Sequence, residues 1–162
     1  MPQKPQQTSG TTSKELRIIA RPATTIEAVK KDPDKLKLLT IIDHLKIISE
    51  RSLNSLVYAL SKEKNIKFRY SFVLVDQIPS SKELSEDVRV LLYLGLVETE
   101  PTLRKLRLTS SGKEFLGQNK LDENTLNELL KAVDELKERI LSEERVAEFS
   151  ARPVRGRRRF RR

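Results

Sequence analysis

Two helices are predicted by the spacing of apolar residues in the first part of the chain. The first begins at Asp32 or Asp34, because Pro33 suits the first turn of a helix. Its apolar stripe is formed by Leu36, Leu39, Ile41, Ile42, Leu45 and Ile48. The second begins with Ser52 as its N-cap and ends in the polar stretch 61–65, and its stripe is formed by Leu53, Leu56, Val57 and Leu60. Both stripes recur at the spacing of one helix face.

A third helix is predicted after a stretch of β-branched and aromatic residues. That stretch, 66–75, indicates a strand or an extended connector, and Pro79 interrupts the pattern that follows it. Ser80 and Glu83 fit a capping box, so the helix should run over about 81–94. Its apolar face is formed by Leu84, Val88, Leu91 and Leu92. Gly95 stands where a left-handed residue is expected to end the helix.

The last part of the chain predicts a hairpin and two more helices. Two short strands, 96–100 and 103–108, flank a turn at Pro101-Thr102. Thr109 should cap a short helix over 110–116, and a long helix should span about 122–149. An a/d stripe on the long helix is formed by Leu126, Leu129, Val133, Leu136 and Ile140. So short a stripe fits packing on the chain's own body and a homodimer seam equally well.

Positive charge is concentrated at the two ends of the chain. The formal net charge of the 162 residues is +9. Residues 34–150 contain 19 basic and 20 acidic residues, whereas 1–33 carry +3 and 151–162 carry +7. The last segment holds only arginines as charged residues, namely Arg152, Arg155, Arg157, Arg158, Arg159, Arg161 and Arg162. Guanidinium groups match phosphate geometry, and neutralising phosphates releases counterions, so this tail predicts nucleic-acid binding rather than mere solubility.

The order of three helices, a hairpin and a further helix resembles that of winged helix-turn-helix proteins. The segment LLYLGLVETEPTLRKLRLTSSGKEFL, 91–116, looks like the third helix, wing and following helix of archaeal and bacterial winged-helix regulators. In these, Gly-Leu-Ile/Val ends the third helix and Leu-Thr-x-x-Gly-Lys closes the wing. Residues 70–98 are similar to winged-helix proteins of the YwgA and Panacea type, although the turn here is Ile78-Pro79-Ser80 and lacks their glycine and aromatic residue.

This resemblance implies an α+β, mostly α, winged helix-turn-helix fold with a long C-terminal helix and disordered ends. The expected organisation is a disordered tail (1–14), a winged-helix domain with an N-terminal arm at about 15–20 (15–117), the long helix (118–150) and a disordered arginine-rich tail (151–162). Proline, glutamine, threonine and serine dominate the first segment, a composition typical of disorder.

In such proteins the third helix enters the major groove and the wing contacts the phosphate backbone or the minor groove. The resemblance therefore implies base-facing roles for Ser81, Lys82, Ser85 and Arg89. It also implies that Arg104, Lys105 and Arg107 form the wing contact. Glu83, Glu86 and Asp87 make the third helix acidic, at −1. Glu83 fits the helix N-terminus, but the acidic balance favours the wing and the tail as the main contacts.

No catalytic or metal-binding constellation is predicted. The chain has no cysteine and a single histidine, His44, which reads as a core or boundary residue. Glu143 and Glu144 read as part of a solvated face, and no glycine-rich phosphate loop or serine elbow is present. The three tyrosines, Tyr58, Tyr70 and Tyr93, lie in apolar stripes and are expected in the core. We therefore expect neither an enzyme nor a cofactor.

The favoured function is a DNA-binding transcriptional regulator or chromatin-associated factor. Alternatives are an RNA- or ribosome-associated protein, and a protein-interaction adaptor whose acidic third helix binds a basic partner. No apolar run suggests a signal peptide or a membrane span, so a cytoplasmic protein is expected. Abundant lysine, glutamate, isoleucine and leucine with one methionine indicates a heat-adapted source, unless lysine and glutamate merely fill solvated helix faces. The resemblance to archaeal winged-helix regulators implies an archaeal source.

Overall fold

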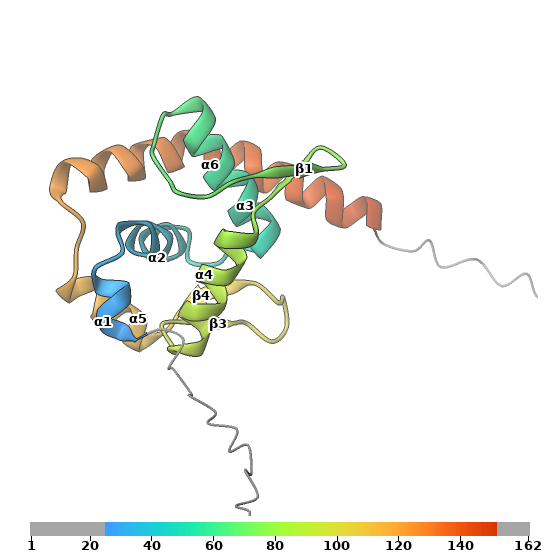
Figure 1. Cartoon of the computed structure of the whole chain (residues 1–162). Coiled ribbons are helices and arrows are strands. Elements are labelled where there is room, and N and C mark those ends of the chain that lie inside the picture. The colour runs from blue at the N-terminus through green and yellow to red at the C-terminus, as the bar shows by residue number, and fades with distance from the viewer. Residues whose placement is uncertain (1–24, 152–162) are drawn as a thin grey trace, which may run out of the picture.

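The computed structural model describes residues 25–151, a mostly helical α+β arrangement with two small antiparallel hairpins and a long last helix. Its elements are α1 (Ile26–Lys30), α2 (Pro33–Leu45), α3 (Glu50–Glu63), β1 (Val73–Val75), β2 (Ile78–Ser80), α4 (Lys82–Tyr93), β3 (Val97–Thr99), β4 (Leu106–Leu108), α5 (Ser110–Gln118) and α6 (Glu123–Ala151). The predicted N-terminal tail and arm, and the arginine-rich tail after Ala151, lie outside the described residues. In Figure 1, α6 runs along one side of the molecule and contacts α2 and α3.

Helix starts follow local side-chain caps, and two of them differ from the prediction. The Asp32 carboxylate caps α2 by accepting from the backbone N–H groups of Asp34 (3.0 Å) and Lys35 (3.4 Å), which selects Asp32 from the two predicted starts, Asp32 and Asp34. Helix α3 starts one turn earlier than predicted, because Ser49 is its N-cap and Ser52 donates its backbone N–H to the Ser49 hydroxyl at 3.1 Å. The prediction that Ser80 caps the helix now labelled α4 is also wrong.

Ser81 is the cap of α4, because Ser80 already belongs to strand β2 and pairs with Val73. The Ser81 hydroxyl accepts from the Leu84 backbone N–H at 3.3 Å and donates to the Glu83 carboxylate at 3.0 Å. At the other end of α4, Gly95 adopts the predicted left-handed conformation, with φ of 72°. The backbone N–H of Leu96 then reaches the carbonyl of Leu91 at 3.0 Å, the pattern of a Schellman motif.

The stretch 66–75 is extended, but only its last three residues form a strand. Strand β1 pairs with β2 around Asp76 and Gln77, which both have positive φ, as a tight hairpin turn requires. The second hairpin, β3–β4, lies where it was predicted, with Val97 opposite Leu108. It gains a third partner in Ile48, which forms an antiparallel bridge with Leu106 through hydrogen bonds of 3.0 and 2.7 Å. Ile48 is therefore not part of the α2 stripe, since α2 ends at Leu45.

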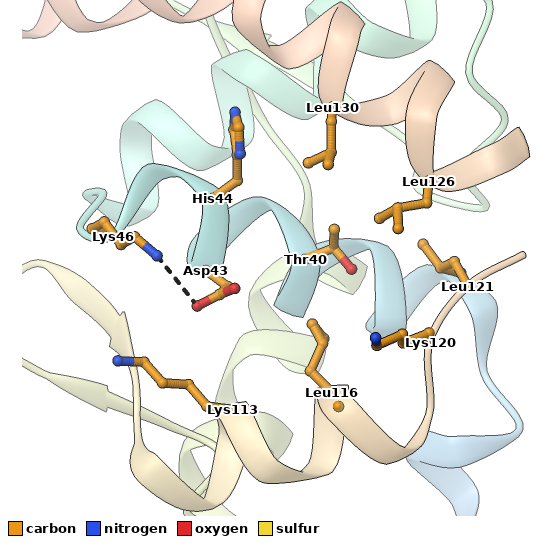
Figure 2. Close-up of a pocket in the computed structure, with 11 residues that line it drawn as sticks. Thr40, Asp43, His44, Lys46, Lys113, Leu116, Lys120, Leu121, Leu126 and Leu130 are labelled. Atoms are coloured by element: carbon orange, nitrogen blue, oxygen red, sulfur yellow. Dashed lines mark ion pairs between the residues drawn. The ribbon is translucent and has the colours of Figure 1, made fainter. Parts of the chain in front are cut away.

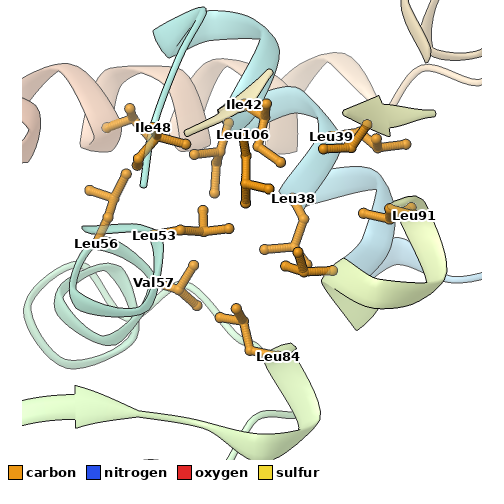
Figure 3. Packing of buried hydrophobic residues seen from close by; sticks show 14 of the residues in the cluster. Leu38, Leu39, Ile42, Ile48, Leu53, Leu56, Val57, Leu84, Leu91 and Leu106 are labelled. Carbon is orange, nitrogen blue, oxygen red and sulfur yellow. The ribbon is translucent and has the colours of Figure 1, made fainter. Parts of the chain in front are cut away.

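One continuous core joins α2, α3, α4, the β3–β4 hairpin and α6. Figure 3 shows its centre, where Leu38 of α2, Leu53 of α3 and Leu84 of α4 approach one another. The a/d stripe of α6 belongs to the same core: Leu129, Val133, Leu136 and Ile140 are buried and Leu126 is half-buried. Within the described chain these side chains pack against the chain's own body. This matches the first of the two predicted alternatives, self-packing, rather than the homodimer seam. A homodimer through this stripe would have to displace that packing.

The close approach of α5 to the β3 region makes Gly112 intolerant of a side chain. A Cβ atom at Gly112 would lie 2.0 Å from the carbonyl oxygen of Leu96, which is part of the backbone. Replacing Gly112 with Ala should therefore lower the free energy of unfolding by about 1–3 kcal/mol, the usual cost of overpacking. Urea denaturation measures this cost.

Gly117, in the same helix, is the matched control for that substitution. A Cβ there meets nothing within 4 Å. Gly117→Ala should consequently raise the free energy of unfolding by up to about 1 kcal/mol through helix propensity. Equal effects of the two substitutions would contradict the close contact at Gly112.

Candidate nucleic-acid interface

The solvent-facing side of α4 is a stripe of polar residues. Lys82, Glu86, Arg89 and Tyr93 are exposed and recur at the spacing of one helix face, with Ser85 half-buried beside them. Two of the sequence predictions are wrong here. Ser81 is only 1% exposed and serves as the cap, so it is not presented to a ligand. Tyr93 was expected in the core but is 76% exposed, because it lies on this outer stripe rather than beside Leu84, Val88 and Leu91.

The surface of α4, the third helix of the sequence prediction, is less acidic than the sequence alone indicates. Asp87 points inward: its carboxylate accepts from the Tyr70 hydroxyl at 2.8 Å and pairs with Lys35 at 3.1 Å and with Arg69. Glu83 is held by the cap, and Glu86 lies 3.8 Å from Lys82. The charged residues left at the surface of α4 are therefore two bases and two acids, so this surface is neutral.

Asp87 belongs to an ionic network that joins the start of α2, the connector 66–72 and α4. Arg69 donates through Nη1 to both carboxylate oxygens of Asp32, at 2.6 and 2.7 Å. Its backbone N–H donates to Asp34 at 3.1 Å. Burial acts to raise the pKa of Asp32, but hydrogen bonds and charge from Arg69 and Lys35 outweigh it and lower this pKa to about 2. Burial, and then Asp87, raise the pKa of Tyr70, so its hydroxyl stays a donor.

The three predicted wing residues differ in exposure and in their ion pairs. Lys105 is only 22% exposed at its side chain and lies 3.4 Å from both Glu144 and Glu148 of α6. Glu144 is thus buried, and the expectation that it is solvated is wrong. Arg107 donates from Nε to Glu98 across the hairpin at 2.7 Å. Arg104, at the exposed tip with φ of 53°, has no ion pair among the described residues.

The contacts of Lys105 with α6 place the start of the arginine tail near the β3–β4 hairpin. Glu148 is three residues before Ala151, the last residue of α6, and a helix rises 1.5 Å per residue. The end of α6 therefore lies about 5 Å along the helix axis from Glu148, which contacts Lys105 of the predicted wing. The seven arginines 152–162 lie outside the described residues, but their point of attachment is beside the β3–β4 hairpin.

The remaining predicted features have structural roles. His44 is half-buried, and its Nε2 lies 2.8 Å from the Asp134 carboxylate, whose pKa is lowered by hydrogen bonds with Lys137 and then His44. Within residues 25–151, no three side chains of His, Cys, Asp or Glu are grouped as a metal site would need. No helix in this part of the chain is long and apolar enough to cross a membrane.

Long-range contacts place several residues in ways that the sequence patterns did not reveal. The inward turn of Asp87 and the pairing of Lys105 depend on partners far along the chain. The helical spacing of Lys82, Glu86 and Arg89 continues to Tyr93, and this spacing could have identified Tyr93 as exposed.

Comparison of the chain with family models, curated proteins and solved structures gives no match.

Proposed function

We propose that the protein binds duplex DNA as a winged-helix factor without catalysing a reaction. In this arrangement α2, α3 and α4 are the three helices, α4 is the recognition helix, and the β3–β4 hairpin is the wing. The Ile48–Leu106 bridge supports the proposal, because it ties the wing to the chain between the first two helices. A wing held in this way has a fixed position relative to α4.

The observation that carries the proposal is the contact of Lys105 with Glu144 and Glu148. It brings the start of the arginine tail to the wing. Body residues 34–150 are close to neutral, so phosphate attraction has to come mainly from the ends of the chain. A tail that starts at the wing can neutralise phosphates of the same duplex that the hairpin contacts.

The recognition helix contributes orientation more than affinity in this proposal. Arg89 and Lys82 are its exposed cations, and Lys82 has Glu86 nearby. Each bidentate base contact gives about 1–3 kcal/mol of discrimination. With one unpaired arginine on its surface, α4 supports modest sequence preference. Its neutral surface also weakens the adaptor alternative, which needed an acidic helix.

RNA binding is the second candidate, and Tyr93 is the observation that favours it. An exposed aromatic ring beside Arg89 is suited to stack on an unpaired base, which duplex DNA does not offer. On this face of α4, duplex DNA would therefore depend on Arg89, whereas an RNA hairpin would also contact Tyr93.

The test is a competition between a fluorescent DNA duplex and unlabelled RNA hairpin or duplex, with the full chain at fixed salt. We expect duplex DNA to compete better, and Arg89→Ala to weaken DNA binding by roughly tenfold, the loss of one good contact. Lys131→Ala is the control, since Lys131 is an exposed cation on α6.

Stronger competition by RNA would favour the second candidate. In that case Tyr93→Ala should weaken RNA binding and Tyr93→Phe should preserve it, because the stacking face is retained. Equal effects of Arg89→Ala and Lys131→Ala would remove α4 from the interface.

A further inference from the structure

A cleft on the side of α2, bounded by α5 and α6, is separate from the proposed DNA-binding surface. Its volume is about 580 Å³, within the range of sites for small molecules. Figure 2 shows the side chains that surround it. They fall into an apolar group and a basic group, which is the pattern expected for an amphipathic ligand.

The apolar group consists of four leucines that converge on the cleft. In Figure 2 they point toward one another from α5, from the α5–α6 connection and from α6; they are Leu116, Leu121, Leu126 and Leu130. All four are only half-buried, so part of their surface is in contact with water. Covering that surface with an apolar ligand removes it from water, which is favourable.

The basic group consists of Lys46, Lys113 and Lys120 at the edge of the cleft. Lys113 and Lys120 are exposed and have no ion pair among the described residues, and Lys46 has only Asp43 at 3.8 Å. The other polar groups of the cleft have partners. The Thr40 hydroxyl donates to the Leu36 carbonyl at 2.8 Å, and His44 contacts Asp134. Three lysines against one aspartate leave the edge of the cleft positive.

Gly117 exposes the backbone of α5 at the cleft. It is the last residue but one of α5, and its position is exposed. It also lines the cleft, and a Cβ added there would meet nothing within 4 Å. Packing within the chain therefore does not require a glycine at this position, whereas close approach of a ligand to the helix backbone would.

We propose that this cleft binds a small organic carboxylate with an apolar body, the carboxylate at the lysines and the body against the leucines. The sign of the charge sets the class of ligand. The basic N-terminal residues Arg17 and Arg21 are of the same sign as the lysines, so the preceding segment of the chain is a poorer occupant. The proposal does not depend on nucleic-acid binding.

The test is a titration of the full chain with octanoate, followed by NMR shifts of the leucine methyl groups. We expect saturable shifts at the four cleft leucines. Replacing Lys113 and Lys120 with Gln should weaken octanoate binding by roughly tenfold, since two exposed charge pairs are lost. Lys62→Gln with Lys131→Gln removes the same charge from exposed positions elsewhere and should leave the affinity unchanged.

Two further measurements separate a built site from general apolar binding. Gly117→Leu should abolish the shifts by filling the cleft while the fold is kept, which the unchanged dispersion of the other methyl signals would show. 1-Octanol, which has no charge, should bind at least several-fold more weakly than octanoate. Equal binding of the two compounds, or an unchanged affinity in the Lys113/Lys120 variant, would overturn the proposal.

Discussion

Replacing all seven arginines of the tail with glutamine will lower duplex binding by orders of magnitude and make it far less sensitive to salt. Each phosphate neutralised adds about 0.9 to the slope of log affinity against log salt, so seven arginines account for a slope of up to about 6. The folded body cannot replace them, because its charges nearly cancel. Fluorescence anisotropy of random-sequence duplex across a range of salt concentrations measures both quantities.

A tail in which the same seven arginines become lysines is the matched control. It keeps the charge and should keep most of the salt slope, while losing the planar fork that binds phosphate oxygens. Affinity at one salt concentration should therefore fall between those of the natural and the glutamine tails. An unchanged slope in the glutamine variant would exclude the tail from DNA binding and place the contact on the body.

Asp87→Asn should lower the free energy of unfolding by about 3–5 kcal/mol, the largest stability effect that we expect of any single substitution here. The Asp87 side chain is 10% exposed and pairs with Lys35, Arg69 and the Tyr70 hydroxyl. Removing its charge leaves two cations facing one another with too few acceptors, and it weakens the link between α4 and the connector. Urea denaturation of the two proteins measures the difference.

Glu86→Gln, at the next residue, is the control for that experiment. Glu86 is exposed and lies 3.8 Å from Lys82, so its loss should change the free energy of unfolding by less than about 1 kcal/mol. Equal effects at positions 86 and 87 would mean that the inward network is not a major contribution to stability. A stable Asp87→Asn protein would mean that asparagine satisfies the same donors.

Features that depend on neighbours in sequence were predicted well. The Thr109 cap, the left-handed Gly95 and the β3–β4 hairpin each follow from a few adjacent residues, and the structure confirms them. Helix periodicity also identified the buried stripe of α6. It could not decide between self-packing and a dimer, because an apolar stripe gives no information about which surface covers it.

Features that depend on distant partners were missed. Charge counting treated Asp87 as a surface acid, since its partners at 35 and 69 are brought to it only by the fold. Lys105 was assigned to phosphate for the same reason, although α6 supplies its carboxylates from about 40 residues away. Ser49 and Ser52 are equally good caps by residue type. The observed cap is Ser49, which directly follows the residue that bridges to Leu106.

The contact of α6 with the β3–β4 hairpin also limits how far along a duplex the arginines of residues 152–162 can reach. Residues 152–162 are eleven residues, and a fully extended segment of that length spans at most about 40 Å. At 3.4 Å per base pair this corresponds to roughly one turn of B-form DNA. Measured from the hairpin, these seven arginines can therefore contact phosphates of the proposed duplex within about one helical turn. In two molecules bound more than two turns apart, the arginines of these segments would contact separate stretches of phosphate.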